Sequence, residues 1–435
     1  MKRLLGVVAR NRDYRRLFTA GAVSQVGDWF NVVALFSLLL KLTGKGEAVA
    51  GVFVLRSLCI FVMGPMAGVL ADRISRRTIM VVADGVRAVT VLGYLLVHDL
   101  GQVWLAYVLV AIHALASAFF DPAQLAAYPN LVPKEDLLLA SALENSLWSF
   151  ALALGSALAG VVMVTLGRDA AFVGDALTFV FSAALLSRLP ALRAKPLEEG
   201  ELLEGNPELP PARPTGGFLS GRRGRLAKAL GLQDVLDGAR YVLGHRRIRT
   251  LLLVKAAFGL TLGGILVLLT VFGERVLGRQ SGGGIAALWT ARGVGSFLGP
   301  LVAWRLGGDS EPALRRGITY AYLAIFFMYL ALAPAPSLWI AVPVLAIANA
   351  GGSILWTYGA SLQQLLVPDA FRGRVFAADN SGLTLTMCIS TLVVGVALDH
   401  GYSPRVLMTG CALVTVFPIV YWISRQKDFA PSRRP

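Results

Sequence analysis

Apolar runs long enough to cross a membrane dominate this chain of 435 residues. A helix needs about 20 apolar residues to span a hydrocarbon core of roughly 30 Å. In the first half such runs lie near 17–41, 47–71, 78–98, 102–121, 137–166 and 169–188. In the second half they lie near 249–273, 282–306, 313–333, 337–366, 372–399 and 402–425. Hydrophobic residues make up 56% of the chain and charged residues 15%, against roughly 25% charged in soluble domains. We therefore predict an all-α integral membrane protein with twelve transmembrane helices, and exclude a soluble enzyme, a disordered chain and a disulfide scaffold.

A polar stretch from Leu189 to Ile248 divides these runs into two sets of six. It contains EEGELLEGNPELPPARPTGG, whose Pro, Gly and Glu content is typical of a linker. A basic amphipathic piece around Arg222 to Tyr241 follows, which either lies on the inner leaflet or serves only as a tether. We predict an N-terminal six-helix bundle over 1–188, a cytosolic linker over 189–248 and a C-terminal six-helix bundle over 249–435.

The basic residues indicate how the chain is oriented. The net charge is +15, and Lys and Arg gather in the N-terminal segment, the linker and alternate loops. The opposite loops hold only Lys41, Lys45, Arg168, Arg275, Arg279 and Arg405. This asymmetry follows the positive-inside rule with both termini in the cytosol. It explains the basic balance without a nucleic-acid partner, and we expect the cytoplasmic (inner) membrane as the location.

The two halves are related by an internal repeat at an offset of 235 residues. The matching positions are Gly64-Pro65 with Gly299-Pro300, Val132-Pro133 with Val367-Pro368, Glu144 with Asp379 and Arg12 with Arg247, and Arg56 returns one residue out of step as Arg292. Each match falls at the same place in its half. The pattern predicts two six-helix bundles in parallel repeat, an arrangement found in transporters.

The loop after the second run reads GVLADRISRR, from Gly68 to Arg77. Its glycine, its Asp-Arg pair and its final basic pair resemble the signature of the major facilitator superfamily, except at Ser75, where the family usually has glycine. The resemblance implies a monomeric transporter that works by alternating access. It also implies a conformational latch, in which this loop docks against the eleventh helix in the outward-facing state and its arginines reach an acid at the end of the fourth. We assign to the latch Gly68, Asp72, Arg73, Arg76, Arg77, Asp121, Glu144 and Asp379. The alternative is a cluster of arginines that only sets topology.

Longer segments make the chain similar to the macrolide-efflux branch of that superfamily, which also holds siderophore exporters. They are NRDYRRLF, SQVGDWFNVVAL, ADGVRAV, FDPAQLAAYPNLVPKEDLLLASALENS and LLVPDAFRGRVFAADNSG. The resemblance implies proton-driven export of an amphipathic drug such as a macrolide. One departure counts against antiport: the helix-five Gly-Pro of many antiporters is absent between Gly155 and Gly160.

Charges inside spans are costly and are functional candidates by default. Asp28 lies about eleven residues into the first run, near the midplane, and Arg56 reaches a similar depth in the second. We predict Asp28 as the proton-coupling residue and Arg56 as its modulator, because pairing with a cation favours the ionised carboxylate. A permanent ion pair that only fixes packing is the alternative. Asp84 and Arg87, three residues apart, are expected to form a local helix pair or to serve the latch.

Aromatic and polar residues at midplane depth are candidates to line a substrate cavity. They are Trp29, Asn31, His113, Trp148, Arg292, Asn349 and Trp356. Indole faces suit an amphipathic or cationic molecule. Arg292 either binds substrate or balances charge, and packing against other helices or lipid is the competing interpretation for the rest, including His113.

Motifs of other chemistries are missing. The chain has no GxxxxGK[ST] loop, no GxSxG and no HExxH. Its four His residues are scattered. We therefore expect no enzyme activity, no cofactor and no metal, and the partners are a small amphipathic substrate, protons and the lipid bilayer. The alternatives are a siderophore or lysolipid exporter on the same fold, and a membrane sensor or assembly factor that transports nothing.

Overall fold

The computed structural model describes Val8 and residues 11–133, 137–192, 242–277, 282–306, 310–367 and 369–429. Almost all of these residues are helical, and no strand occurs among them. The helices of the first half are α2 (Arg12–Thr43), α3 (Gly46–Arg73), α4 (Arg76–Gly93), α5 (Val103–Leu131), α6 (Leu137–Thr165) and α7 (Arg168–Leu186). Those of the second half are α10 (Arg246–Val271), α11 (Gly283–Leu306), α12 (Glu311–Leu332), α13 (Leu338–Leu366), α14 (Asp369–Asp399), α15 (Pro404–Val414) and α16 (Val416–Ser424).

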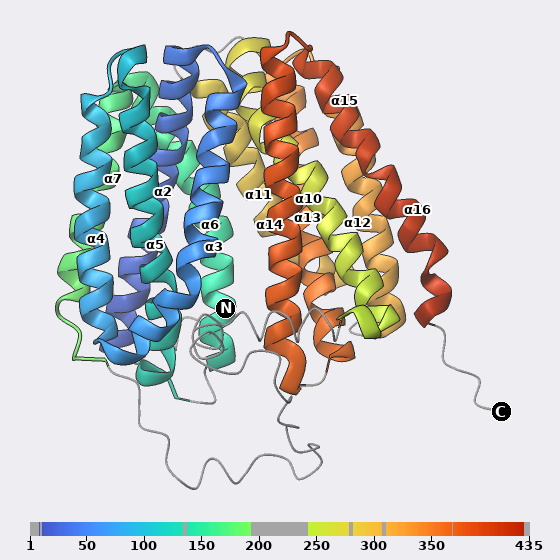
Figure 1. Ribbon diagram of the computed structural model, residues 1–435, viewed down its shortest axis with the longest axis horizontal. Coiled ribbons are helices and arrows are strands. Elements are labelled where there is room, and N and C mark those ends of the chain that lie inside the picture. The colour runs from blue at the N-terminus through green and yellow to red at the C-terminus, as the bar shows by residue number, and fades with distance from the viewer. Residues whose placement is uncertain are drawn as a thin grey trace, which may run out of the picture.

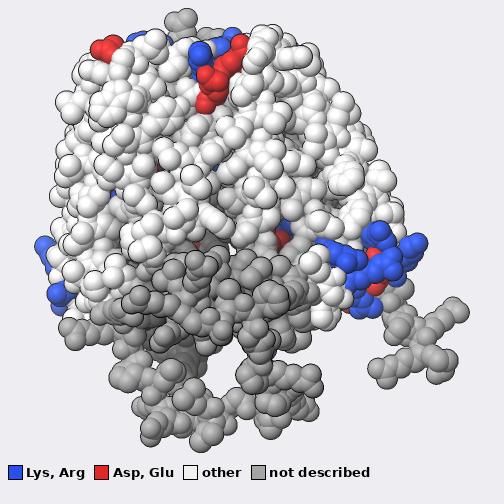
Figure 2. All heavy atoms as spheres, in the orientation of Figure 1, with Lys and Arg blue, Asp and Glu red and all other residues white. Residues whose placement is uncertain are grey.

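Eleven of the twelve predicted spans are confirmed. Within the described residues, 11 helical stretches are long and apolar enough to cross a membrane, with α15 and α16 forming one of them. Helix α12 lies where the remaining span was predicted, but Glu311, Arg315 and Arg316 in its first two turns shorten its apolar stretch, and its crossing of the membrane stays a prediction. The outer surface fits a lipid environment, because large apolar side chains such as Val89 and Trp339 are exposed on it. Figure 2 shows charged side chains near the two ends of the molecule and an almost uncharged band between them.

One predicted boundary differs from the structure. The fourth apolar run was expected to end at residue 121, but α5 continues through Pro122 to Leu131. Proline removes a backbone donor and usually ends a helix, yet α5 packs along α3 and α4 over its length. Neighbouring helices let transmembrane helices tolerate proline. Asp121 therefore lies ten residues before the end of α5, about 15 Å along its axis at 1.5 Å per residue.

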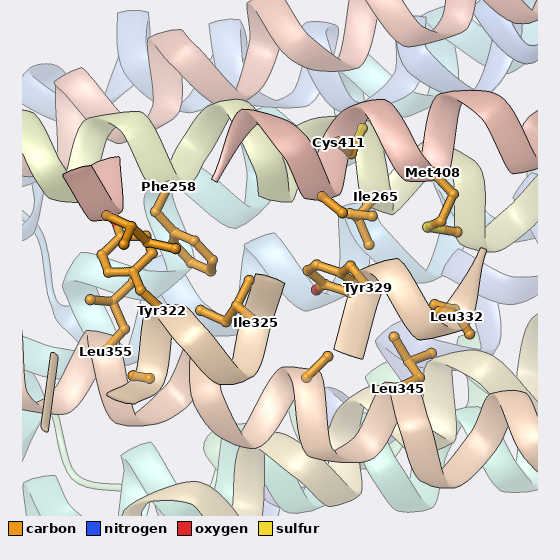
Figure 3. Close-up of a cluster of buried hydrophobic side chains, with 14 of the residues drawn as sticks. Phe258, Ile265, Tyr322, Ile325, Tyr329, Leu332, Leu345, Leu355, Met408 and Cys411 are labelled. Carbon is orange, nitrogen blue, oxygen red and sulfur yellow. The ribbon is translucent and has the colours of Figure 1, made fainter. Parts of the chain in front are cut away.

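The helices form two bundles side by side, blue to green and yellow to red in Figure 1. In the first, α2 packs on α6 and α7, and α4 packs on α5 and α7. In the second, α10 packs on α14, and α13 packs on α11 and α12. Each bundle has its own apolar core. Figure 3 shows the second, where Phe258, Tyr322 and Tyr329 pack among aliphatic side chains.

Two helix pairs join the bundles: α6 with α11, and α3 with α14. Gly293 of α11 makes the first contact possible, because a Cβ there would overlap the backbone of Ala153 in α6. Small residues allow such close approach between helices in lipid, where packing replaces the hydrophobic effect. The α6–α11 interface therefore depends on a glycine at this position.

Charged and polar groups clamp the two bundles at the end where α2 meets α3. Asp399, at the end of α14, accepts hydrogen bonds from the amides of Gly46 (2.7 Å) and Glu47 (3.0 Å) at the start of α3. Arg275, in the π-helical turn after α10, donates to the carbonyl of Gly44. A carboxylate at a helix N-terminus also benefits from the helix dipole. We call these contacts the end clamp.

Replacing Asp399 with Ala should loosen the end clamp. Hydrogen bonds to a charged group contribute about 1.5–3 kcal/mol each, so the two ends should separate in a larger fraction of molecules, by about tenfold or more. Spin labels at Lys41 and Tyr402 in a cysteine-free background would report the distance between the bundles. Lys45→Ala is the control, because the exposed Lys45–Glu47 pair should contribute little. An unchanged distance distribution in Asp399→Ala would show that the clamp does not hold this end.

Candidate functional site

Asp28 lies in the interior of the first bundle, on α2. One carboxylate oxygen is 3.4 Å from His113 Nε2 on α5, and the other is 3.9 Å from a guanidinium nitrogen of Arg87 on α4. Three helices thus meet at a single carboxylate. The side chain of Asp28 keeps 23% of its surface exposed, whereas Arg87 keeps 3% and His113 6%.

Arg87 also forms an ion pair with Asp84, one helical turn earlier on α4. Asp84 is fully buried. The guanidinium of Arg87 lies over two aromatic rings, 4.1 Å from the centroid of Phe120 and 4.5 Å from that of Phe179. Cation–π contacts of this kind stabilise a desolvated cation. Arg87 is therefore held between two carboxylates and two rings.

A third carboxylate, Asp175 on α7, is fully buried beside α2. Its backbone carbonyl accepts a hydrogen bond from Thr178 Oγ1 at 2.7 Å. The close contact depends on Gly27, because a Cβ at that position would overlap both Thr178 Oγ1 and the carboxylate of Asp175. The charges of Asp28 and Arg87 both act on Asp175. We call Asp28, Asp84 and Asp175, together with Arg87 and His113, the carboxylate cluster.

Arg56, on α3, borders the carboxylate cluster. It lines a cavity of about 30 Å³, large enough for about one water molecule, together with Asn31 and His113. Its charge acts on Asp28, but the groups at ion-pair distance from Asp28 are Arg87 and His113. The role predicted for Arg56 as a modulator of Asp28 stays a prediction.

Aromatic side chains from both bundles meet beside this cluster. The ring of Trp29 on α2 is 6.0 Å from that of Trp148 on α6 and 5.6 Å from that of Trp289 on α11. Arg292, one turn after Trp289, has its guanidinium 5.1 Å from the Trp289 ring and 5.9 Å from the Trp148 ring. Trp148 is 45% exposed and Trp289 is buried. We call Trp29, Trp148, Trp289 and Arg292 the interface aromatic site.

The other predicted cavity residues lie apart from this site in the second bundle. Asn349 is buried on α13 and donates to the carbonyl of Leu345 in its own helix. Trp356, also on α13, is 47% exposed and its ring lies 5.0 Å from Lys255 Nζ. Lys255 forms a buried ion pair with Asp379 of α14 and donates to Gln363.

The predicted latch residues are dispersed. Arg76 donates to the carbonyl of Ala126 at 2.6 Å and to the side chain of Asn130, both near the end of α5. Arg77 donates to the carbonyl of Leu189. Asp121, the expected partner of these arginines, is exposed earlier in the same helix. The surroundings of Gly68, Asp72 and Arg73 lie outside the described part of the chain.

Glu144 and Asp379, the two acids of the repeat, perform the same task in their bundles. Glu144 on α6 accepts from Gln25 of α2 at 2.7 Å and from Tyr128 of α5 at 2.6 Å. Asp379 on α14 binds Lys255 of α10. Each acid thus ties its helix to the first helix of its own bundle.

Three charged residues of these sites were missed or undervalued by sequence reasoning. Asp175 and Lys255 received no role, although a lone charge in AFVGDALTFV or LLLVKAAFGL is the signal that identified Asp28. Arg87 was assigned to a local pair, which it forms, but it also reaches Asp28. Among the described residues, no group of His, Cys, Asp and Glu has the arrangement of a metal site.

Comparisons with known proteins also indicate a transporter. A family model described as Major Facilitator Superfamily matches residues 17–391. The chain is 27% identical to an MFS-type transporter of Mycobacterium tuberculosis over 94% of this chain and 91% of that protein. It is 29% identical to the MFS-type transporter YfiS of Bacillus subtilis over 40% of this chain, and it is 28% identical to macrolide efflux protein A of Streptococcus pyogenes, also over 40%. These two matches span only 41% and 44% of the relatives' own lengths.

The fold is similar to that of solved transporters. A bacterial homologue of the human lysosomal transporter Spinster, in an inward-facing and unoccupied conformation, has a TM-score of 0.71 and 13% sequence identity. The similarity covers 96% of this chain and 98% of that one. At this identity the likeness concerns the fold alone.

Removing one partner of the Arg87–Asp84 pair should destabilise the protein. Arg87→Gln leaves two carboxylates without their cation, and breaking a buried ion pair costs about 3–5 kcal/mol. In detergent, Arg87→Gln should therefore clearly lower the thermal unfolding temperature. The double variant Asp84→Asn/Arg87→Gln should recover part of the loss, because it removes a buried charge as well.

The control is Arg16→Gln, which breaks the more exposed Asp13–Arg16 pair and should cost less than about 1 kcal/mol. Equal unfolding temperatures for Arg87→Gln and Arg16→Gln would contradict a structural role of the buried pair.

Proposed function

The chain belongs to the major facilitator superfamily, and we propose that it is a proton-coupled exporter of amphipathic compounds such as macrolides. As a member of that family it is a membrane-spanning transporter of small molecules. The proton coupling, the export direction and the class of compound are the proposal. It rests on the carboxylate cluster, with the likeness to macrolide efflux protein A as the support for the substrate.

The charge balance of the cluster carries the proposal. Three carboxylates lie around Arg87, with His113 beside them, and the charge of Arg56 acts on Asp28 from the border of the cluster. With all three ionised and His113 neutral, the cluster and Arg56 together hold one negative charge in excess. An uncompensated buried charge is disfavoured by several kcal/mol. One proton, on a carboxylate or on His113, makes the group neutral, and this is the stoichiometry that a one-proton switch requires.

Asp28 is the member of the cluster that is suited to exchange this proton. Its side chain is 23% exposed, while Asp84 and Asp175 are fully buried. It is also the only one of the three carboxylates on α2, next to Trp29 of the interface aromatic site. We infer that protonation of Asp28 releases Arg87 and His113 and lets α2 move relative to α4 and α5. The state that binds substrate then depends on the proton.

The interface aromatic site supports a substrate with a large apolar face. Its three indole rings come from both bundles, and the Trp29 ring lies within about 6 Å of each of the other two, at the contact that must change when the bundles rock. Aromatic walls with few polar groups are typical of sites for amphipathic molecules. We assign the binding of the apolar part of the substrate to Trp29, Trp148 and Trp289.

The proposal also covers the contacts that close the cytosolic end and the orientation of the chain in the membrane. Arg76 bound near the end of α5, and the pairs of Glu144 and Asp379, hold the helix ends opposite the end clamp. We propose that these contacts rearrange when that end closes. In this proposal both termini lie in the cytosol, and the protein acts as a monomer. The two bundles, 1–188 and 249–435, then move relative to each other, and residues 189–248 act as the tether between them.

Two alternatives make different predictions. A siderophore or lysolipid exporter would move its substrate through the same site without macrolide recognition. A sensor or assembly factor would move nothing. Three buried acids, Asp84, Asp175 and Asp379, and the partly exposed Asp28 favour a transporter, because buried charges are costly in a bundle that serves only for packing.

Substrate-driven proton movement in proteoliposomes tests the proposal. Purified protein with an enclosed pH indicator should move protons when macrolides or other amphipathic compounds are added, and Asp28→Asn should abolish the movement while leaving expression and folding intact. Asp175→Asn should reduce it as well, because the charge balance changes.

Asp169→Asn is the matched control, since Asp169 is 71% exposed at the start of α7. Normal proton movement in Asp28→Asn would remove Asp28 from the coupling mechanism. Transport of a labelled lipid or siderophore without proton movement in the wild type would favour the first alternative, and no transport of any compound would favour the second.

A further inference from the structure

Arg292 of the interface aromatic site has no anionic partner among the described residues. In the part of the chain that the structure describes, no carboxylate forms an ion pair with it, and its Nε is buried without a hydrogen bond. Two buried cations are paired with carboxylates, since Arg87 binds Asp84 and Lys255 binds Asp379, whereas Arg76 is held by a backbone carbonyl and Asn130. Arginine remains charged at any physiological pH. A positive charge is therefore held unpaired near the middle of α11.

The indole rings beside Arg292 compensate this charge only in part. Each cation–π contact contributes about 0.5–2 kcal/mol, and the distances of 5.1 and 5.9 Å are at the longer end of the range for such contacts. The effective cost of desolvating an ion is several kcal/mol. The rings are thus too weak to replace a carboxylate, and the guanidinium keeps most of its capacity for an anion.

The position of Arg292 places it where a transported molecule would pass. It lies one residue before Gly293, at a close contact between α6 and α11, and its side chain is only partly buried. Trp148, on the opposite bundle, is 45% exposed. A ligand between the bundles would therefore meet a guanidinium fork flanked by two indole faces. This combination recognises a carboxylate or phosphate attached to an apolar body.

From this geometry we propose that Arg292 binds an anionic group of the transported compound, so that the substrates are amphipathic acids or zwitterions rather than simple cations. The inference rests on the proposed transport function, and it narrows the amphipathic substrates to those that carry an anionic group, in place of the macrolides. Substrate binding would supply the missing counter-charge, and Trp148 and Trp289 would contact the apolar part of the same molecule. Because the guanidinium offers two parallel donors, carboxylate and phosphate are both suited to it.

A matched set of ligands tests the charge preference. An arylalkyl carboxylic acid, its primary amide and the amine of the same skeleton differ mainly in the polar group. Binding to the purified wild-type protein can be followed by quenching of tryptophan fluorescence. The acid should bind at least about tenfold more tightly than the amide, because a charged hydrogen bond contributes about 1.5–3 kcal/mol, and the amine should bind most weakly.

Variants of Arg292 identify the residue responsible. Arg292→Gln should remove the preference for the acid, and Arg292→Lys should keep part of it, since charge remains but the planar fork is lost. Arg316→Gln, at an exposed arginine of α12, should leave the preference unchanged. Equal affinities for acid and amide in the wild type, tighter binding of the amine, or a preserved acid preference in Arg292→Gln would each overturn the proposal.

The same ligands separate this proposal from the proton-coupling mechanism. If the amine or a macrolide drives proton movement and the acid does not bind, the exporter stands and the anion site fails. If the acid binds through Arg292 but drives no proton movement, the anion site stands and the coupling fails.

Discussion

The cost of a charge in a low-dielectric interior governs the arrangement of this molecule. Apolar side chains can be exchanged among themselves with small changes in energy, but each buried ion requires a partner. Arg87 satisfies this requirement with two carboxylates and two aromatic rings, and it thereby fixes α2, α4, α5 and α7 around one point. Lys255 and Asp379 do the same for α10 and α14. The packing of each bundle follows from where its charges can be neutralised.

The carboxylate cluster and the interface aromatic site differ in which charge is left without a partner. In the carboxylate cluster of the first bundle, carboxylates exceed cations, so a proton completes the balance. At the interface, Arg292 is a cation without a carboxylate among the described residues, so an anionic ligand would complete its balance. The interior thus has one place suited to a proton and another suited to an anion. The sum of the two charges is the same with both ligands bound as with neither, whereas either ligand alone leaves one unit of net charge in the interior, which is costly in a membrane.

The sequence was sufficient to predict the arrangement of the helices, but not which charged side chains contact one another. Twelve apolar runs, their charge asymmetry and the repeat predicted helices whose bounds differ mostly by a few residues from those found. The exception, α5, extends through Pro122 because tertiary packing outweighs the local effect of proline. Depth along a helix could be counted from the sequence, and this count predicted Asp28 and Arg56 at similar depth. Rotation about each helix axis could not, and it decides that Arg87 rather than Arg56 contacts Asp28. Asp175 is brought near by Gly27, a contact between distant segments that no local pattern records.

Helix α2 is the element that can connect proton and substrate. Adjacent residues on a helix point about 100° apart at 3.6 residues per turn, so Asp28 faces α4 and α5 while Trp29 faces α6 and α11. A rotation of α2 that moved Asp28 away from Arg87 would shift Trp29 against Trp148 and Trp289 by a comparable amount. Coupling of this kind needs no relay of intervening side chains, because both groups belong to one rigid helix. It requires only that protonation change the free energy of the Asp28 contacts while substrate changes that of the Trp29 contacts, so that both ligands bias the same movement.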